Sequence, residues 1–225
     1  NIFSLKYFGI FFLIISFFSF FNIIYSYYFN LLNNLSSYIF TFSITLMIGL
    51  FLTLFKNYKY EKINLFERIL IVLTGYLILP AAISLPYYFN IDSLGLINCY
   101  FEAISGFTST GFTIFNDLNQ LDQAIILWRS SSQWIGGLYF LFSILLLIDI
   151  FDENLKRSLT NYISLNSSEI FKQVFKIIVI YLTMTILIFL MLKLVNIRSY
   201  DAYNYSLTII SSGGFLPNNN FDTTF

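Results

Sequence analysis

The sequence has no histidine and a single cysteine, Cys99. Without histidine, the chain lacks the commonest general base and the commonest metal ligand of proteins. One cysteine cannot form a disulfide within the chain, and we expect Cys99 to be a small buried apolar residue. These absences argue against a histidine-based active site and against a cofactor held by this chain.

Charged residues are also scarce, at 11% of the 225 residues against 57% that are hydrophobic. A soluble domain has about a quarter of its residues charged. Twelve basic and twelve acidic residues cancel, which indicates no nucleic-acid partner and no acidic substrate. No charge lies between Lys6 and Lys56, between Arg68 and Asp92, or between Arg129 and Asp149. Such gaps match the ~20 residues that cross a bilayer, so the sequence predicts a polytopic membrane protein.

The apolar pattern predicts five membrane helices, at about 5–29, 36–55, 66–89, 128–148 and 174–195. An Asn-rich turn, NLLNNLSS (30–37), separates the first two. The 28 Phe and 17 Tyr residues are expected on the lipid-facing surface. With a cytoplasmic N-terminus, nine basic residues lie on the inner side and three on the outer side, namely Arg129, Lys193 and Arg198. This asymmetry agrees with the positive-inside rule.

Two uncharged segments rich in Ser, Thr and Gly interrupt the apolar pattern. Each follows an expected membrane helix and a short amphipathic stretch, and they read ISGFTSTGF (104–112) and YNYSLTIISSGGF (203–215). Phe101–Ile114 aligns with Asn204–Pro217 at an offset of 103 residues. The repeated unit is therefore a helix, a short re-entrant helix, a Ser/Thr/Gly loop and a closing helix. Both loops enter from the outer side.

Loops of this composition at membrane depth indicate a pore lining. Non-helical backbone is tolerated there only where it is buried in protein or lines a watery cavity. Glycine permits φ > 0, and main-chain carbonyl oxygens with Ser and Thr hydroxyls can then replace the water around an alkali cation. The C-terminal end of the preceding short helix carries a partial negative charge that favours a cation.

Other interpretations are kept beside this one. A single Ser/Thr/Gly cluster is more often an external turn. Gly106 to Gly111 has the spacing of a phosphate-binding loop, but Phe112 stands where the lysine is required and no strand precedes it. A membrane-embedded enzyme would need ionisable groups that converge at membrane depth, whereas the acidic residues fall mostly in loops. A structural membrane scaffold is a further alternative.

Two motifs, FEAISGFTSTGFT (101–113) and WRSSSQWIGG (128–137), resemble the first pore region of the Trk/Ktr/HKT superfamily of potassium transporters. The helix before that pore resembles NLFERILIVLTGYLILPAAISLPYYF (64–89), and the second pore loop resembles SLTIISSGGF (206–215). The likeness is greatest to bacterial Trk-type membrane subunits. It implies channel-like potassium uptake across the bacterial inner (cytoplasmic) membrane, through a selectivity filter of backbone carbonyls.

The resemblance also implies which residues bind the ion. Gly111 and Gly214 match the filter glycines of the family, so the filter residues are Thr108, Ser109, Thr110, Gly111, Ser211, Ser212, Gly213 and Gly214. In relatives, Ser at the first filter position accompanies sodium and Gly accompanies potassium, so Gly111 favours potassium. Leu216 and Pro217 depart from the usual hydroxyl-rich continuation of the second loop.

The superfamily has four helix–pore–helix units around a pseudo-fourfold pore. We therefore expect an all-α membrane protein with an extra helix pair at 1–58, a first unit at 59–150 and a second unit at 151–225, truncated after its loop. The start at Asn1 favours an N-terminal fragment that would not conduct alone. A subunit with two pore loops that dimerises is the alternative.

The same resemblance implies partners. They are the lipid bilayer, a second copy in a homodimer, and a cytosolic nucleotide-binding regulatory subunit. Potassium is the substrate, and symport with H⁺ or Na⁺ is left open. The loops at 56–68 and 151–173 could touch a cytosolic partner.

Residues beside the loops are candidates for structural support. Arg129 is expected either to pair with Glu102 or Asp122 and support the loop, or to lie at the interface as a lipid anchor. Trp134, with Gly136 and Gly137, is expected to let a neighbouring helix approach closely, as small residues do between membrane helices.

Overall fold

A computed structural model describes residues 2–54, 65–91, 93–147 and 170–218. In these ranges all regular secondary structure is helical. Five helical segments are long and apolar enough to cross a membrane: Lys6–Tyr28, Asn34–Leu54, Leu65–Asn90, Gln123–Leu147 and Phe175–Leu194. The prediction of an all-α protein with five membrane helices is confirmed.

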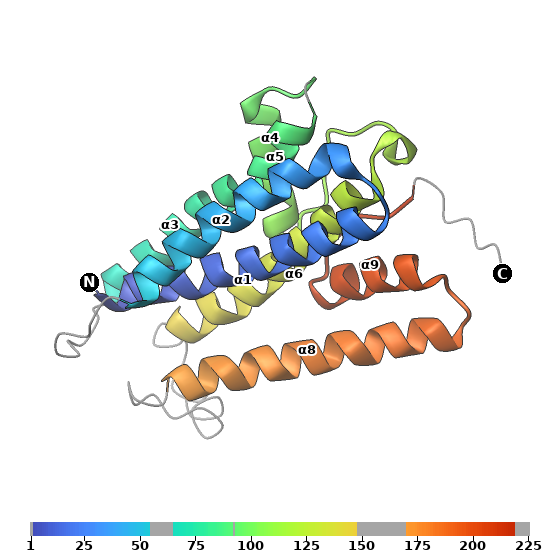
Figure 1. The fold of residues 1–225 in the computed structure, drawn as a ribbon. Helices are drawn as coiled ribbons and strands as arrows, with labels where there is room; N and C mark the ends of the chain where they lie inside the picture. Colours follow the sequence, from blue (N-terminus) through green and yellow to red (C-terminus); the bar gives the residue numbers. More distant parts are fainter. Residues whose placement is uncertain (1, 55–64, 92, 148–169, 219–225) are drawn as a thin grey trace.

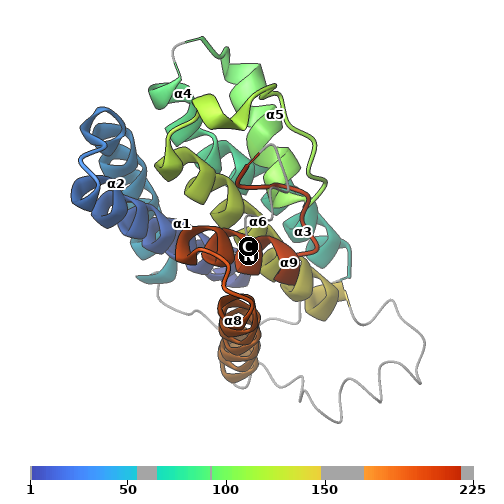
Figure 2. The same ribbon diagram turned by 90° about the vertical axis from the view of Figure 1, so that its right-hand side faces the viewer.

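The long helices run side by side, and the short ones lie between or beyond them (Figure 1). The long helices are α1 (Ile2–Tyr28), α2 (Leu32–Leu54), α3 (Leu65–Ile83), α6 (Gln123–Leu147) and α8 (Ile170–Leu194). The short ones are α4 (Leu85–Asn90), α5 (Leu96–Phe107), the 3-10 turn η1 (Leu118–Gln120) and α9 (Ser199–Ile210). Viewed along α8, this helix stands at the edge of the molecule, and α9 lies between it and α6 (Figure 2).

The turn between α1 and α2 is shorter than the sequence predicts. Asn30 adopts φ 56°, the left-handed conformation that commonly ends a helix. The amides of Asn30 and Leu31 then donate to the carbonyls of Tyr27 and Ser26. Helix α2 begins already at Leu32, within the segment expected to be a turn. Within this helix the Ser37 hydroxyl donates to the Asn34 carbonyl at 2.7 Å, so its polar hydrogen is satisfied inside α2.

The third predicted helix, expected as one unit over 66–89, is divided at Ser84 into α3 and α4. Pro86 lies in the first turn of α4. Proline has no amide hydrogen, and its ring clashes with the carbonyl four residues earlier, so an uninterrupted helix through it is disfavoured. Ser84 itself keeps helical dihedral angles, with φ −73° and ψ −17°, and α3 and α4 together form one of the five spans.

Many aromatic residues form the core rather than the lipid-facing surface. Tyr7 and Phe11 of α1 meet Tyr139 and Phe142 of α6 edge to face, with Phe11 and Tyr139 ring centroids 4.9 Å apart. These rings are almost fully buried. The expectation that the Phe and Tyr excess faces lipid is thus only half right, because the helices also pack against one another through aromatic pairs.

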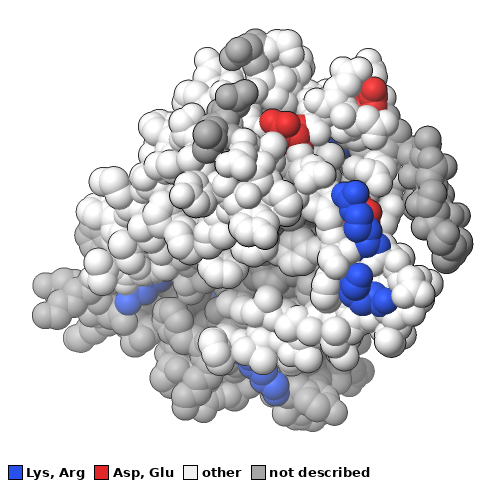
Figure 3. Space-filling model, turned by 45° about the vertical axis from the view of Figure 1, so that its right-hand side comes forward, with Lys and Arg blue, Asp and Glu red and all other residues white. Residues whose placement is uncertain are grey.

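The remaining aromatic and aliphatic side chains do cover the outside. Helix α8 is the most exposed of the five spans, because only 11% of its 18-residue apolar stretch is buried. On the face drawn in Figure 3 charged atoms are few and most of the described surface is uncharged. Such a surface suits contact with lipid. The predicted basic loops lie largely outside the described residues.

Candidate functional site

The two Ser/Thr/Gly segments follow short helices of equal length. Helices α5 (Leu96–Phe107) and α9 (Ser199–Ile210) each contain 12 residues, and each ends at the boundary that the 103-residue offset predicts. The residues after them form what we call the first loop (108–112) and the second loop (211–215).

Both short helices end in the same way. The residues Ser109 and Ser212 each have φ 54°, in the left-handed region. The next amide in each loop donates back to the helix, Thr110 to the Ser105 carbonyl at 3.0 Å and Gly213 to the Thr208 carbonyl at 2.8 Å. The Ser109 amide donates to the Gly106 carbonyl, and the Ser212 amide donates to the Ile209 carbonyl. Together the two bonds at each helix end form a Schellman cap.

These caps occupy loop amides and leave loop carbonyls free. Within the part of the chain that the structure describes, no hydrogen bond ends on the main-chain oxygens of 108–111 or 211–214. The hydroxyl hydrogens, in contrast, are used locally. Thr108 Oγ1 lies 2.7 Å from the Ile104 carbonyl, and Ser211 Oγ lies 3.0 Å from the Leu207 carbonyl. The loop carbonyls and the lone pairs of these hydroxyl oxygens are therefore the ligands that the loops can offer.

The two loops touch at their glycines. A Cβ placed on Gly111 would lie 2.6 Å from the Cα of Gly214, and Gly111 itself has φ +80°. Both the conformation and the contact require glycine at position 111. The structure thus brings together two segments that lie 103 residues apart in the sequence.

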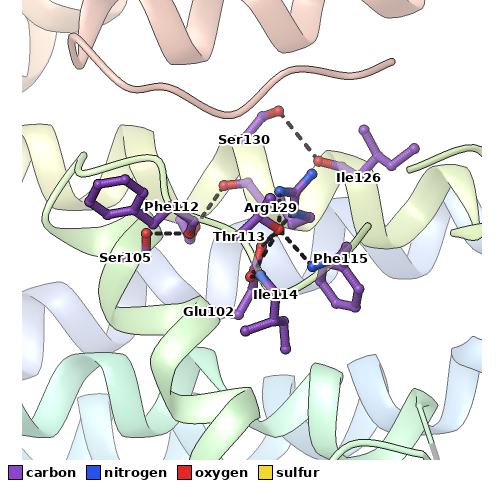
Figure 4. Close-up of polar contacts among 10 residues, drawn as sticks. Glu102, Ser105, Phe112, Thr113, Ile114, Phe115, Ile126, Arg129 and Ser130 are labelled. Carbon is purple, nitrogen blue, oxygen red and sulfur yellow. Dashed lines mark hydrogen bonds and ion pairs between the residues drawn. The ribbon is translucent and has the colours of Figure 1, made fainter. Parts of the chain in front are cut away.

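A buried ion pair stands behind the first loop (Figure 4). The Nε of Arg129 lies 2.8 Å from Oε1 of Glu102, and both side chains are at most 1% exposed. Thr113 Oγ1 accepts from Nη2 of Arg129 at 3.0 Å and donates to the Glu102 carboxylate. The amide of Ile114 donates to Oε2 of Glu102 at 3.0 Å. Of the partners left open by the sequence, Arg129 has Glu102, and its burial excludes a position at the lipid interface.

Arg129 also reaches the second loop. Its guanidinium carbon lies 4.1 Å from the centre of the Phe215 ring, a cation–π contact. Phe215 is 2% exposed, whereas the equivalent Phe112 of the first loop is 69% exposed. One arginine on α6 therefore contacts both Thr113, directly after the first loop, and Phe215 of the second loop.

Gln133 is a contact residue that sequence reasoning missed. It is fully buried on α6, one turn after Arg129, and its amide faces the second loop. The sequence signal was present, because Gln133 lies within the quoted motif WRSSSQWIGG. The motif gave no reason to assign it a partner 80 residues away.

Trp134 and the following glycines pack as expected. The Trp134 ring lies between Phe18 of α1 and Tyr181 of α8, with centroids 5.1 and 4.9 Å away, and its Nε1 donates to Thr185. A Cβ on Gly136 would lie 1.8 Å from the Phe107 carbonyl oxygen. Helix α6 can therefore approach the end of α5 only because position 136 lacks a side chain.

We expect Gly136→Ala to destabilise the protein by about 3 kcal/mol, as overpacking of a tight contact does. The Phe107 oxygen is main chain, so it cannot rotate away from the added methyl group, and α6 must move from α5. Denaturant titration in detergent measures the change. Gly95→Ala is the control, because a Cβ there meets nothing within 4 Å. Equal stability of the two variants would show that the α5–α6 contact is looser than the structure indicates.

Of the predicted site residues, the structure brings together Gly111 and Gly214, with the Thr110 carbonyl oxygen 3.7 Å from a Cβ placed on Gly214. Ser211 and Gly213 lie against Gly137 and Gln133 of α6. The ion-binding roles of Thr108, Ser109, Thr110, Gly111, Ser211, Ser212, Gly213 and Gly214 stay a prediction. Among the described residues there is no group of three or more Cys, Asp or Glu side chains that could hold a metal ion.

The fold and the paired loops define a polytopic helical membrane protein with two equivalent helix–loop segments that meet at Gly111 and Gly214. A family model described as TrkH, cation transport protein, matches residues 35–220. The chain therefore belongs to the TrkH family of cation transport proteins.

Individual relatives agree with this assignment. The chain is 31% identical over 193 residues to an uncharacterised cation transporter of Methanocaldococcus jannaschii. The aligned region is 80% of this chain and 39% of that protein. It is 28% identical over 185 residues to the Trk system potassium uptake protein TrkH of Salmonella typhimurium, covering 78% and 38%. The chain thus spans about two fifths of the length of these relatives, which are transporters rather than enzymes.

A solved structure has the same fold. The crystal structure of the potassium transporter TrkH from Vibrio parahaemolyticus matches with a TM-score of 0.71 at 23% identity. The match covers 96% of this chain and 44% of that one. Nearly all of this chain is therefore folded like part of a larger membrane protein.

Proposed function

We propose that the protein takes up potassium across the cytoplasmic membrane, and that the first and second loops supply backbone oxygens to the ion. The ion-binding residues are Thr108, Ser109, Thr110, Gly111, Ser211, Ser212, Gly213 and Gly214. The observation that carries this proposal is the contact of two identically capped loops at Gly111 and Gly214.

The chemistry of the loops supports a bare monovalent cation. Backbone carbonyls can replace the hydration shell of potassium without any carboxylate in direct contact. Helices α5 and α9 both end at the loops, so the partial negative charge of each C-terminus, about half an elementary charge, lies at the same place. Glu102 is neutralised by Arg129 and does not contribute a free charge.

The wider architecture is part of the same proposal. An extra helix pair (1–58) precedes a first helix–loop–helix unit (59–150) and a second unit of which 151–225 holds the first helix and the loop, and two further units complete the pore. The N-terminus is cytoplasmic, and uptake is driven by the membrane potential, which supplies about 2.3 kcal/mol per charge for each 100 mV. A homodimer and a cytosolic nucleotide-binding regulatory subunit complete the assembly.

The direct test is ion uptake by the full natural protein in lipid vesicles. With an inside-negative potential, we expect potassium influx to exceed sodium influx by about tenfold or more, equivalent to at least ~1.4 kcal/mol of discrimination. Vesicles without protein provide the background rate. Equal influx of the two ions, or influx no greater than background, would contradict the proposal.

A further inference from the structure

Helix α6 of the first unit holds the backbone of the second loop. With the Gln133 amide oriented by its hydrogen-bonding partners, its oxygen accepts from the amides of Gly214 and Phe215, both at 3.0 Å. Its nitrogen donates to Oγ1 of Thr208 at 3.1 Å. The side chain is fully buried, so water does not compete for these bonds.

The bonds from Gln133 to the two amides also fix the directions of the Gly213 and Gly214 carbonyls. The described chain has no cis peptide bond. In a planar trans peptide the N–H and C=O groups point in opposite directions. Because the amides of Gly214 and Phe215 both point toward Gln133, the carbonyls of Gly213 and Gly214 both point away from it. Two consecutive oxygens are thereby directed to one side of the loop, away from α6.

The first loop is held differently. Ser105 and Thr208 are equivalent at the 103-residue offset, and Ser105 Oγ donates directly to the carbonyl of Phe112 at 2.6 Å. In the second loop the equivalent hydroxyl oxygen, that of Thr208, instead accepts from the Gln133 amide nitrogen. The oxygen of the same Gln133 amide accepts from the Phe215 amide. The first loop is thus held at the Phe112 carbonyl by a hydroxyl of its own unit. The second loop is held at the Phe215 amide by a side chain of the preceding unit.

The neighbouring glycine fits this arrangement. A Cβ on Gly213 would lie 2.4 Å from the Gln133 amide, so the amide occupies the space that a side chain would need. Gly213 does not have a positive φ. Its lack of a side chain is therefore explained by the position of Gln133 rather than by backbone conformation.

We propose that Gln133 is a positioning residue for ion selectivity, which sets the carbonyls of the second loop from the closing helix of the first unit. This inference rests on the proposed function, since it assigns the selectivity of that same site. Gln133 does not contact the ion; it acts through the amides of Gly214 and Phe215.

The test compares Gln133→Met with Gln133→Glu in the full natural protein. Methionine has a similar length but cannot accept the two amide hydrogens, and unsatisfied buried amides are costly. We expect the potassium-to-sodium influx ratio to fall about tenfold in Gln133→Met. Glutamate keeps an acceptor oxygen and should retain most of the ratio. Ser131→Ala, a buried α6 residue that bonds only within its own helix, is the matched control and should be unchanged.

Hydrogen exchange provides a readout that does not depend on transport. The amides of Gly214 and Phe215 should exchange about tenfold faster in Gln133→Met than in the wild type or Ser131→Ala. Unchanged exchange, or equal losses of selectivity in the Met and Glu variants, would overturn the inference. If the wild type does not discriminate potassium from sodium, the proposed function fails, while the exchange rates still decide whether Gln133 holds the loop.

Discussion

Gly111→Ser is expected to lower the potassium-to-sodium influx ratio of the full natural protein by about tenfold or more. The residue has φ +80°, a conformation that costs a residue with a side chain about 1–2 kcal/mol. Its new Cβ would also lie 2.6 Å from the Cα and 2.9 Å from the amide nitrogen of Gly214. These are main-chain atoms, so the second loop itself must move. Flux of each ion into vesicles measures the result.

Two further glycines show whether the effect is specific. A Cβ on Gly214 would lie 3.1 Å from the Cα of Gly111, and Gly214 has no positive φ, so Gly214→Ser should lower the ratio less. Gly95 is the N-cap residue of α5 and has open space around it, so Gly95→Ser should leave the ratio unchanged. If all three variants behaved alike, the contact between the loops would not determine selectivity.

Glu102→Gln is expected to lower the free energy of unfolding by about 3–5 kcal/mol. Removing the carboxylate charge leaves Arg129 buried and uncompensated, and breaking one side of a buried ion pair has costs of this size. The same carboxylate accepts from Thr113 and the Ile114 amide, and glutamine offers one acceptor oxygen in place of two, so the segment after the first loop also loses part of its attachment to α5. Denaturant titration of the protein in detergent measures the loss.

The double variant and an exposed pair provide the controls. Glu102→Gln combined with Arg129→Met removes both charges, and stability should recover in part because no unpaired charge remains. Arg198 is 63% exposed and lies 3.3 Å from Asp201, so Arg198→Ala should change stability by less than about 1 kcal/mol. A Glu102→Gln effect as small as that of Arg198→Ala would show that the buried pair adds little.

Local patterns were sufficient to predict the helices and the loop boundaries. The apolar pattern predicted five spans, and five are found among the residues that the structure describes. The offset of 103 residues placed the ends of α5 and α9 correctly, because a helix end depends on a few neighbouring residues.

Partners distant in the sequence could not be predicted in this way. Arg129 had two candidate acidic partners, Glu102 and Asp122, and composition does not choose between them. The aromatic residues were assigned to the lipid-facing surface because hydrophobicity alone does not distinguish a neighbour helix from a lipid chain. In the structure, Tyr7 and Tyr139 instead lie in one buried cluster, with ring centroids 6.0 Å apart.

The sequence by itself determined a membrane protein with five apolar helices and two equivalent Ser/Thr/Gly segments, because length, hydrophobicity and capping are local properties of the chain. Only the tertiary structure decided that Gly111 meets Gly214 and that Gln133 reaches the second loop. Those contacts arise from the packing of α6 against both short helices, and the direction of helix packing is not encoded in any single segment.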